Sequence, residues 1–196
     1  MFDDLDKSIE NLLKRELPAD LVSQVTISFA TPDNSFPPST VSLPAIDLFL
    51  YDIRENRDLR DGEWRLERQS DGSAVRKAPL VRVDCSYLVT AWPSDSSPAP
   101  AKDEHRLLGE VMKALLRHSS LPATVLEGSL QGQEPPLPSS TLQPGRLQSL
   151  AEFWQAVGGK PKATLSYTVT LGVEPTAPFE AGPPVREAVF KMEQGV

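Results

Sequence analysis

The sequence predicts an α/β fold of the α+β kind, in which a mixed, mostly antiparallel sheet is flanked by two or three helices. Two kinds of segment predict it: those in which apolar and polar residues alternate indicate strands, and those with apolar residues at helical spacing indicate helices. The chain has 196 residues, of which 39% are hydrophobic, so it can bury a core of its own. We expect a single domain over residues 1–174 and a proline-rich C-terminal arm over 175–196.

Three segments are expected to be helical. Residues 2–17 place five apolar side chains on one helical face, and the segment ends before Pro18. Residues 103–118 carry a second apolar set at the same spacing. Residues 146–159 form a shorter helix, which the glycine pair at its end should stop.

Four segments indicate strands, at residues 24–31, 44–53, 78–92 and 162–174. The second is apolar at nearly every position except Asp47 and Asp52, which is typical of a strand covered on both faces. The spacing of these two aspartates places them on opposite faces of a regular strand. A pair of carboxylates acting together is therefore not expected from them.

The segments between these elements are also informative. Residues 54–77 carry seven basic and six acidic side chains, which indicates a solvated excursion, with a hairpin turn at Asp71-Gly72. Prolines are concentrated in residues 129–145 and 174–185. Because proline cannot donate a backbone hydrogen bond, we expect no regular element in either proline-rich segment.

Composition excludes several classes of protein. A formal net charge of −7 disfavours general binding to nucleic acid or to an anionic membrane. The single cysteine, Cys85, excludes a disulfide within the chain and, with only two histidines, the familiar zinc patterns. Nowhere do about 20 apolar residues follow one another, so no membrane span is expected. The first sixteen residues, MFDDLDKSIENLLKRE, do not have the pattern of a secretory signal.

Asp103, Glu104 and His105 place three ionisable side chains in a row. A metal site on a helix needs ligands three or four residues apart, so that they project from one face, and consecutive residues do not meet this requirement. Their position at the start of a helix explains them better. Asp103 would cap free N–H groups, while Arg117 and His118 would complement the negative end of the helix dipole.

No other pattern predicts catalysis. The phosphate-binding loop G-x-x-x-x-G-K-[ST] and the serine motif G-x-S-x-G are both missing from the sequence. Cys85 lies within a strand and is expected to be a buried structural thiol. Phe153 and Trp154 are expected to pack a helix against the sheet, whereas Trp64 and Trp92, in or beside loops, could contact a partner. We therefore expect no enzyme activity, cofactor or metal.

Three stretches together resemble the cap or tail-terminator proteins of contractile injection systems, the phage-tail-like particles of bacteria. They are LPAIDLFLYDIRENRDLR at 43–60, YLVTAW followed by DEHRLLGEVMKALLRH between 87 and 118, and EFWQAVGGKPKATLSYTVTL at 152–171. The resemblance covers most of residues 3–174. It implies a tail-terminator-like fold and a hexameric ring that ends the inner tube and sheath. It also implies assembly in the bacterial cytoplasm as part of the particle.

The resemblance implies three partners, namely further copies of the chain, the inner tube protein and the sheath protein. Two segments are candidate interfaces: the arginine-rich excursion, and an alternating stretch at 185–194 that could add a strand to a neighbour. The residues proposed to contact partners are Arg54, Arg57, Arg60, Trp64, Arg65, Trp92, Val185 and Val189.

Alternatives remain open from the sequence. The charges of the excursion could satisfy one another in a solvated loop. The chain could instead be a small hydrolase or transferase that uses His105 with a distant carboxylate, or an adaptor or chaperone of particle assembly.

Overall fold

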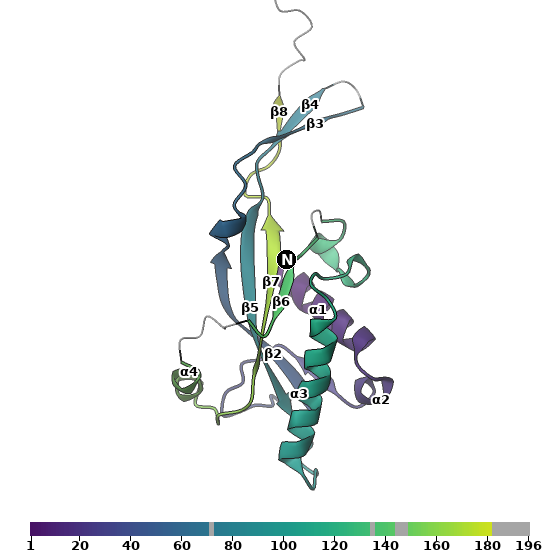
Figure 1. Cartoon of the computed structure of the whole chain (residues 1–196), viewed down its shortest axis with the longest axis vertical. Helices are drawn as coiled ribbons and strands as arrows, with labels where there is room; N and C mark the ends of the chain where they lie inside the picture. Colours follow the sequence, from purple (N-terminus) through teal and green to yellow (C-terminus); the bar gives the residue numbers. More distant parts are fainter. Residues whose placement is uncertain (71–72, 134–135, 144–148, 182–196) are drawn as a thin grey trace, which may run out of the picture.

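Two sheets organise the chain (Figure 1), and the computed structural model describes residues 1–70, 73–133, 136–143 and 149–181. The main sheet has five strands in the order β1-β2-β5-β7-β6, and the distal sheet has three in the order β3-β4-β8. Among the described strands only β1 and β2 pair in parallel, so the prediction of a mixed, mostly antiparallel sheet is confirmed. The strands are β1 (Thr26–Ser28), β2 (Ala45–Glu55), β3 (Arg65–Arg68), β4 (Ala74–Lys77), β5 (Val81–Trp92), β6 (Ser139–Thr141), β7 (Leu165–Val173) and β8 (Phe179–Ala181).

Two long helices cover one face of the main sheet (Figure 1). They are α1 (Phe2–Glu16) and α3 (Pro100–Leu116), and the shorter elements are α2 (Ala19–Val22), α4 (Leu150–Val157) and the 3-10 turns η1 (Arg57–Leu59), η2 (Ala123–Val125) and η3 (Gly128–Leu130). Four of the five apolar side chains in the stripe of α1, those of Leu5, Ile9, Leu12 and Leu13, are fully buried in the core, as the helical spacing predicts, and Phe2 is partly buried against it. Burying one such leucine or isoleucine side chain contributes about 1.5–3 kcal/mol, so this stripe is a main source of stability.

The core of the molecule lies between these helices and one face of β5 and β7. Cys85, Tyr87 and Val89 of β5 meet Tyr167 and Val169 of β7 in the same buried cluster. Alternation along each strand brings them together, because residues two apart point to the same face. The buried thiol predicted at Cys85 is confirmed, and burial raises its pKa to about 12.

The short helix α4 covers part of the opposite face (Figure 1). The Phe153 ring lies 5.9 Å from that of Phe49 on β2, and Trp154 is only 2% exposed. Ser149 caps the start of the helix by accepting a hydrogen bond from the Glu152 backbone N–H. The predicted packing against the sheet is thus confirmed for Phe153, and the Trp154 ring is buried beside it, with 5.4 Å between the ring centroids.

A β-bulge in β2 changes which side chains share a face. The register with β5 shifts between Leu50 and Asp52, so Asp47 lies opposite Thr90 and Asp52 opposite Ser86. Thr90 and Ser86 are four residues apart on a regular strand and point to one face, so both aspartates do as well. The expectation of opposite faces was wrong, because alternation was counted through the bulge. The two carboxylates still lie about 13 Å apart along the sheet, at about 3.3 Å per residue.

Both proline-rich segments contain a short strand, contrary to expectation. β6 lies within residues 129–145 and pairs with β7, and β8 lies within residues 174–185 and pairs with β4. Three residues between prolines are too few to show the alternation of apolar and polar residues that indicates a strand. Each of these strands forms because it pairs with the edge of a strand from a distant part of the chain, β7 for β6 and β4 for β8. The predicted hairpin in 54–77 is confirmed as β3 and β4, although its turn at Asp71-Gly72 lies outside the described residues.

The carboxyl group of Asp47 on β2 is fully buried in the main sheet. Asp47 is 0% exposed, and its Oδ1 accepts a hydrogen bond of 3.0 Å from the Ala30 backbone N–H. Its Oδ2 has no hydrogen-bond partner among the described residues. Because burial disfavours the charged form, the pKa of Asp47 rises from 3.8 to about 7.

We expect this group to make stability depend on pH. Between about pH 4 and pH 7 the folded chain holds the Asp47 proton and the unfolded chain does not, so its contribution to the free energy of unfolding falls as pH rises. The loss is on the order of 4 kcal/mol, at about 1.4 kcal/mol per pKa unit. Denaturant titrations across this range should show a flatter profile for Asp47→Asn than for the unchanged protein.

The control for this experiment is Asp20→Asn, which removes a carboxylate from an exposed position on α2. Its profile should run parallel to that of the unchanged protein. If the Asp47→Asn profile also ran parallel, the buried proton would be excluded as the source.

Candidate interaction surface

The distal sheet extends beyond one end of the main sheet (Figure 1). At its base, the Asp84 carboxylate on β5 accepts hydrogen bonds from Thr170 Oγ1 at 2.7 Å and from Asn56 Nδ2 at 3.1 Å. Asn56 also caps η1, because its Oδ1 accepts a hydrogen bond from the Leu59 backbone N–H. These contacts fix the point at which the chain leaves β2 for the distal sheet.

Three of the predicted contact arginines lie along this base. The nearest acidic oxygen is 2.8 Å away for Arg54, on Asp52, and 3.6 and 4.0 Å away for Arg60 and Arg57, both on Glu55. Their side chains remain 56%, 69% and 83% exposed, in the same order. Ion pairs this exposed contribute about 0–1 kcal/mol. The three guanidinium groups thus form only weak ion pairs within the chain, and they remain exposed enough to contact another protein.

The strand register divides the distal sheet into two faces. Residues directly opposite on neighbouring strands share a face, which places Leu66, Arg76 and Phe179 together. Trp64 joins this face: its ring lies 5.5 Å from that of Phe179, and the Arg76 guanidinium lies 5.0 Å from its centre. Trp64 is 44% exposed, so the prediction that it is accessible to a partner agrees with its position.

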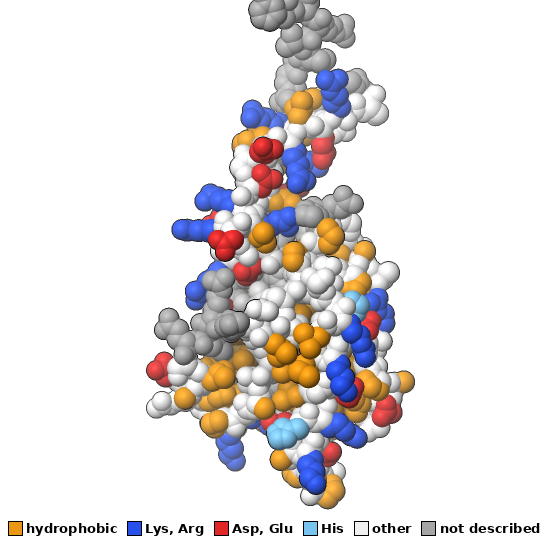
Figure 2. Space-filling view, in the orientation of Figure 1, with side chains coloured by type: hydrophobic (Ala, Val, Ile, Leu, Met, Phe, Trp, Pro, Cys, Tyr) orange, Lys and Arg blue, Asp and Glu red, His pale blue; other side chains and the backbone are white. Residues whose placement is uncertain are grey.

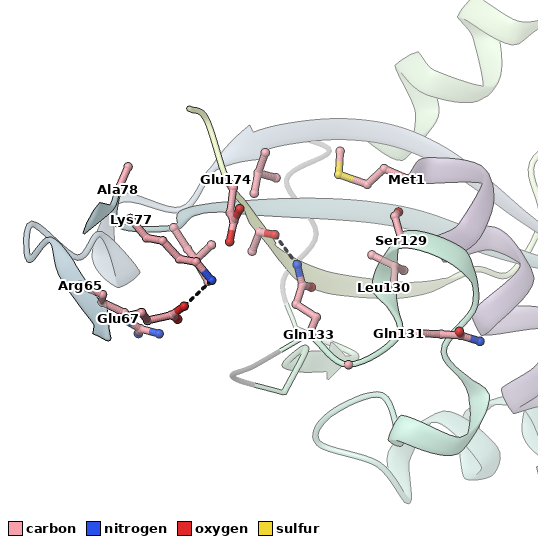
Figure 3. Close-up of a pocket in the computed structure, with 14 residues that line it drawn as sticks. Met1, Arg65, Glu67, Lys77, Ala78, Ser129, Leu130, Gln131, Gln133 and Glu174 are labelled. Carbon is pink, nitrogen blue, oxygen red and sulfur yellow. Dashed lines mark hydrogen bonds and ion pairs between the residues drawn. The ribbon is translucent and has the colours of Figure 1, made fainter. Parts of the chain in front are cut away.

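The other face of the distal sheet borders a cavity of about 640 Å³ (Figure 3). Arg65 and the ion pair of Glu67 with Lys77, at 2.9 Å, lie on its distal side, and the hydrogen bond to Glu67 raises the pKa of Lys77. Across the cavity, Gln133 Nε2 donates to the Gly172 carbonyl. The lining residues are Met1, Arg65, Glu67, Lys77, Ala78, Leu80, Ser129, Leu130, Gln131, Gly132, Gln133, Gly172, Val173 and Glu174. The lining carries charges of both signs and has no excess of either.

Trp92 lies far from this surface along the chain and in a different setting. Its ring stacks on Phe36 at 4.3 Å between centroids, and the Lys162 ammonium lies 4.6 Å from its centre. Lys162 also pairs with Glu104 of α3. Trp92 therefore joins three segments of its own chain, and contact with a partner stays a prediction for it.

The ionisable trio at the start of α3 does not converge. Glu104 pairs with Lys162, and His105 is exposed. Asp103 accepts a hydrogen bond of 2.5 Å from the Ser97 hydroxyl. Among the described residues, no group of three or more His, Cys, Asp or Glu side chains could hold a metal ion.

The predicted cap by Asp103 was wrong. The helix begins at Pro100, three residues earlier than expected, and the preceding residue, Ala99, makes no side-chain cap. Proline is favoured in the first turn because its missing N–H and fixed φ cost nothing there. Asp103 still lies in the first turn, where its charge complements the helix dipole.

Two of the predicted contact residues, Val185 and Val189, lie outside the described residues. Sequence reasoning also missed Leu66, Arg76 and Phe179. The alternation of Trp64 and Leu66 with charged neighbours was a usable signal for a strand with one apolar face. Phe179 gave no such signal, because its place depends on pairing with a strand about one hundred residues earlier. No helix in the described part of the chain is long and apolar enough to cross a membrane.

Comparison with known proteins connects this architecture to a family. The family of the Pvc16 N-terminal domain matches residues 4–187. The sheath/tube terminator of the extracellular contractile injection system PVC, in its extended state, is similar over 100% of this chain and 64% of its own, with 26% identity and a TM-score of 0.71. The tube-terminating cap of the anti-feeding prophage shares the fold over 96% of this chain and 60% of its own, with 24% identity and a TM-score of 0.64.

This chain thus spans less than two thirds of the length of either solved relative. A comparison with curated proteins finds no match. The resemblance to terminator caps and the fold class that it implies are confirmed by the two solved structures. Because the family match covers most of its length, the chain belongs to the family of Pvc16 N-terminal domains.

Proposed function

We propose that this chain is a structural cap protein that terminates the inner tube and sheath of a contractile injection system. The observation that carries the proposal is the similarity to a sheath/tube terminator over 100% of the chain, at 26% identity. In this role the chain forms a hexameric ring and contacts the inner tube protein and the sheath protein. It assembles in the bacterial cytoplasm and then remains part of the particle.

The arrangement of the two sheets suits this role. A terminator must bind the last subunits of a polymer without offering a new site for the next one, so shape decides its action. The main sheet with α1 and α3 supplies a rigid body, and the distal sheet extends from it as a second contact element (Figure 1). We propose residues 1–174 as one domain and 175–196 as an arm, whose first part returns to the distal sheet as β8.

The enzyme alternative has little support in the described residues. His105 is exposed, and both acidic residues beside it make contacts within the chain. A general base needs its reacting partner within hydrogen-bond reach and a site that can exclude water. We therefore propose that the chain has no catalytic activity and acts by contact alone.

The first test of the cap is particle length. Without a terminator, tube and sheath growth has no stop, so particles assembled without this chain should be longer and more variable, as measured by negative-stain electron microscopy. Adding the purified chain should restore one length, and His105→Ala should do so equally well. Unchanged lengths without the chain would contradict the proposal, and its absence from purified particles would favour an assembly chaperone.

A second prediction concerns the arginines at the base of the distal sheet. The double variant Arg57→Glu with Arg60→Glu should bind purified tube or sheath at least ten-fold more weakly, because exposed guanidinium groups form paired hydrogen bonds with carboxylates. The matched control is Lys102→Glu with Arg106→Glu, which makes the same change of charge at exposed positions of α3. If both double variants bound equally well, residues 54–77 would be a solvated excursion and not a contact surface.

A third prediction concerns residues 185–194, which we propose to pair as a strand with a neighbouring subunit or a sheath arm. Deleting residues 182–196 should weaken ring formation or docking at least ten-fold in a pull-down assay. This deletion retains β8, whereas deleting 175–196 also removes β8 and Phe179 from the distal sheet. If only the longer deletion had an effect, β8 and not the terminal stretch would make the contact.

A further inference from the structure

The outward face of the distal sheet carries large apolar side chains that are exposed. Leu66 is 58% exposed, Phe179 47% and Trp64 44%. We call these residues, with Arg76, the tryptophan face. The strands behind it are three or four residues long, and a sheet this small is only marginally stable unless it packs on something else. Contiguous exposed apolar residues in such a place mark an interaction site.

The tryptophan face is already ordered for binding. The Trp64 and Phe179 rings meet edge to face, with an interplanar angle of 67°, and Arg76 lies over the Trp64 ring. Tryptophan, phenylalanine and arginine are enriched in the centres of protein interfaces. Side chains that hold one another in place lose less rotamer entropy when a partner binds.

The body of the same chain does not reach this face. The distal sheet extends away from α1, α3 and α4 (Figure 1), and its charged face, with Arg65, Glu67 and Lys77, is the one that borders the cavity. The apolar face thus points away from the main sheet. Its partner must come from outside the described body.

Charge indicates what the partner is. Arg76 of the tryptophan face, and Arg68, which the strand register places on the same side of the sheet, make no ion pair with the described residues. This side of the distal sheet therefore suits a surface that carries carboxylates. Residues 54–77 carry seven basic and six acidic side chains, whereas the whole chain has a net charge of −7, so the remainder carries −8. Figure 2 shows basic side chains next to acidic ones on the distal sheet and at its base, and further basic side chains on the body. A second copy of the chain therefore offers the opposite charge to the distal sheet of the first.

We infer that the tryptophan face docks on the body of a second copy of this chain, that is, on residues outside 54–77, which together carry a net charge of −8. Contact between two different surfaces of identical subunits generates a ring when the rotation between neighbours closes, and an open filament when it does not. The inference rests on the proposed ring and names the surface that would hold it together.

The first experiment places a photo-crosslinking residue, benzoylphenylalanine, at position 66 of the full chain. Isotopically heavy and light chains are mixed before irradiation, and the crosslinked peptides are analysed by mass spectrometry. Pairs that join a heavy to a light peptide are expected, because the face contacts another copy. Crosslinks confined to one copy, such as those from residue 66 to residues 182–196 of the same chain, would overturn the inference.

The second experiment measures the dissociation constant of self-association by analytical ultracentrifugation. Leu66→Ser should raise it at least ten-fold, and Trp64→Ser about 30-fold or more, as is typical of central interface residues. The matched control is Leu59→Ser on η1, since the exposed fraction of Leu59, 47%, is similar to the 58% of Leu66 and Leu59 belongs neither to the tryptophan face nor to the body. It should change the constant less than two-fold.

The outcomes separate this inference from the proposed function. If Leu66→Ser and Leu59→Ser associated like the unchanged protein, the tryptophan face would be excluded as the docking surface, while the chain could still limit particle length. If the unchanged chain limited length as a monomer, the inference would fail and the cap would stand. If self-association depended on Leu66 but particle length did not depend on the chain, the proposed cap function would be contradicted. The inference that the tryptophan face docks on a second copy would remain supported.

Discussion

The structure depends on the pairing of β5 with strands on both of its sides. This strand runs for twelve residues, with β2 along one edge and β7 along the other. One of its faces gives Cys85, Tyr87 and Val89 to the core under α1 and α3. Its other face gives Asp84, whose hydrogen bonds to Thr170 and Asn56 fix the base of the distal sheet. Core and projecting surface are thus positioned by the same backbone.

Much of this fold could be predicted from local patterns. The helix α1 and the strand β7 show clear periods in the sequence, and both form close to the expected bounds. The bulge in β2 and the strands β6 and β8 could not be found in this way, because each depends on a partner strand far away in the sequence. The same limit applies to the candidate surface. Trp64 was identified from its setting, whereas Phe179 became visible only once β8 was placed beside β4.

The placement of charge and apolar surface is consistent with a protein that acts by contact. The ionisable groups of the trio on α3 are distributed among separate local contacts. The exposed aromatic and arginine side chains gather instead on the distal sheet. The distal sheet has its exposed aromatic side chains on one face and the charged residues Arg65, Glu67 and Lys77, which border the cavity, on the other. The body between α1, α3 and the main sheet keeps a continuous apolar core.

The order of the strands in the distal sheet has a consequence for biosynthesis. Arg76 of β4 lies opposite Phe179 of β8, so that sheet joins parts of the chain that leave the ribosome at very different times. Closing so long a loop is entropically costly until the intervening segments have folded and brought its ends together. A nascent chain therefore completes its tryptophan face late, after the core of the main sheet has formed. Until β8 pairs with β4, the face that carries Trp64 and Leu66 lacks Phe179, so it is complete only in a finished subunit.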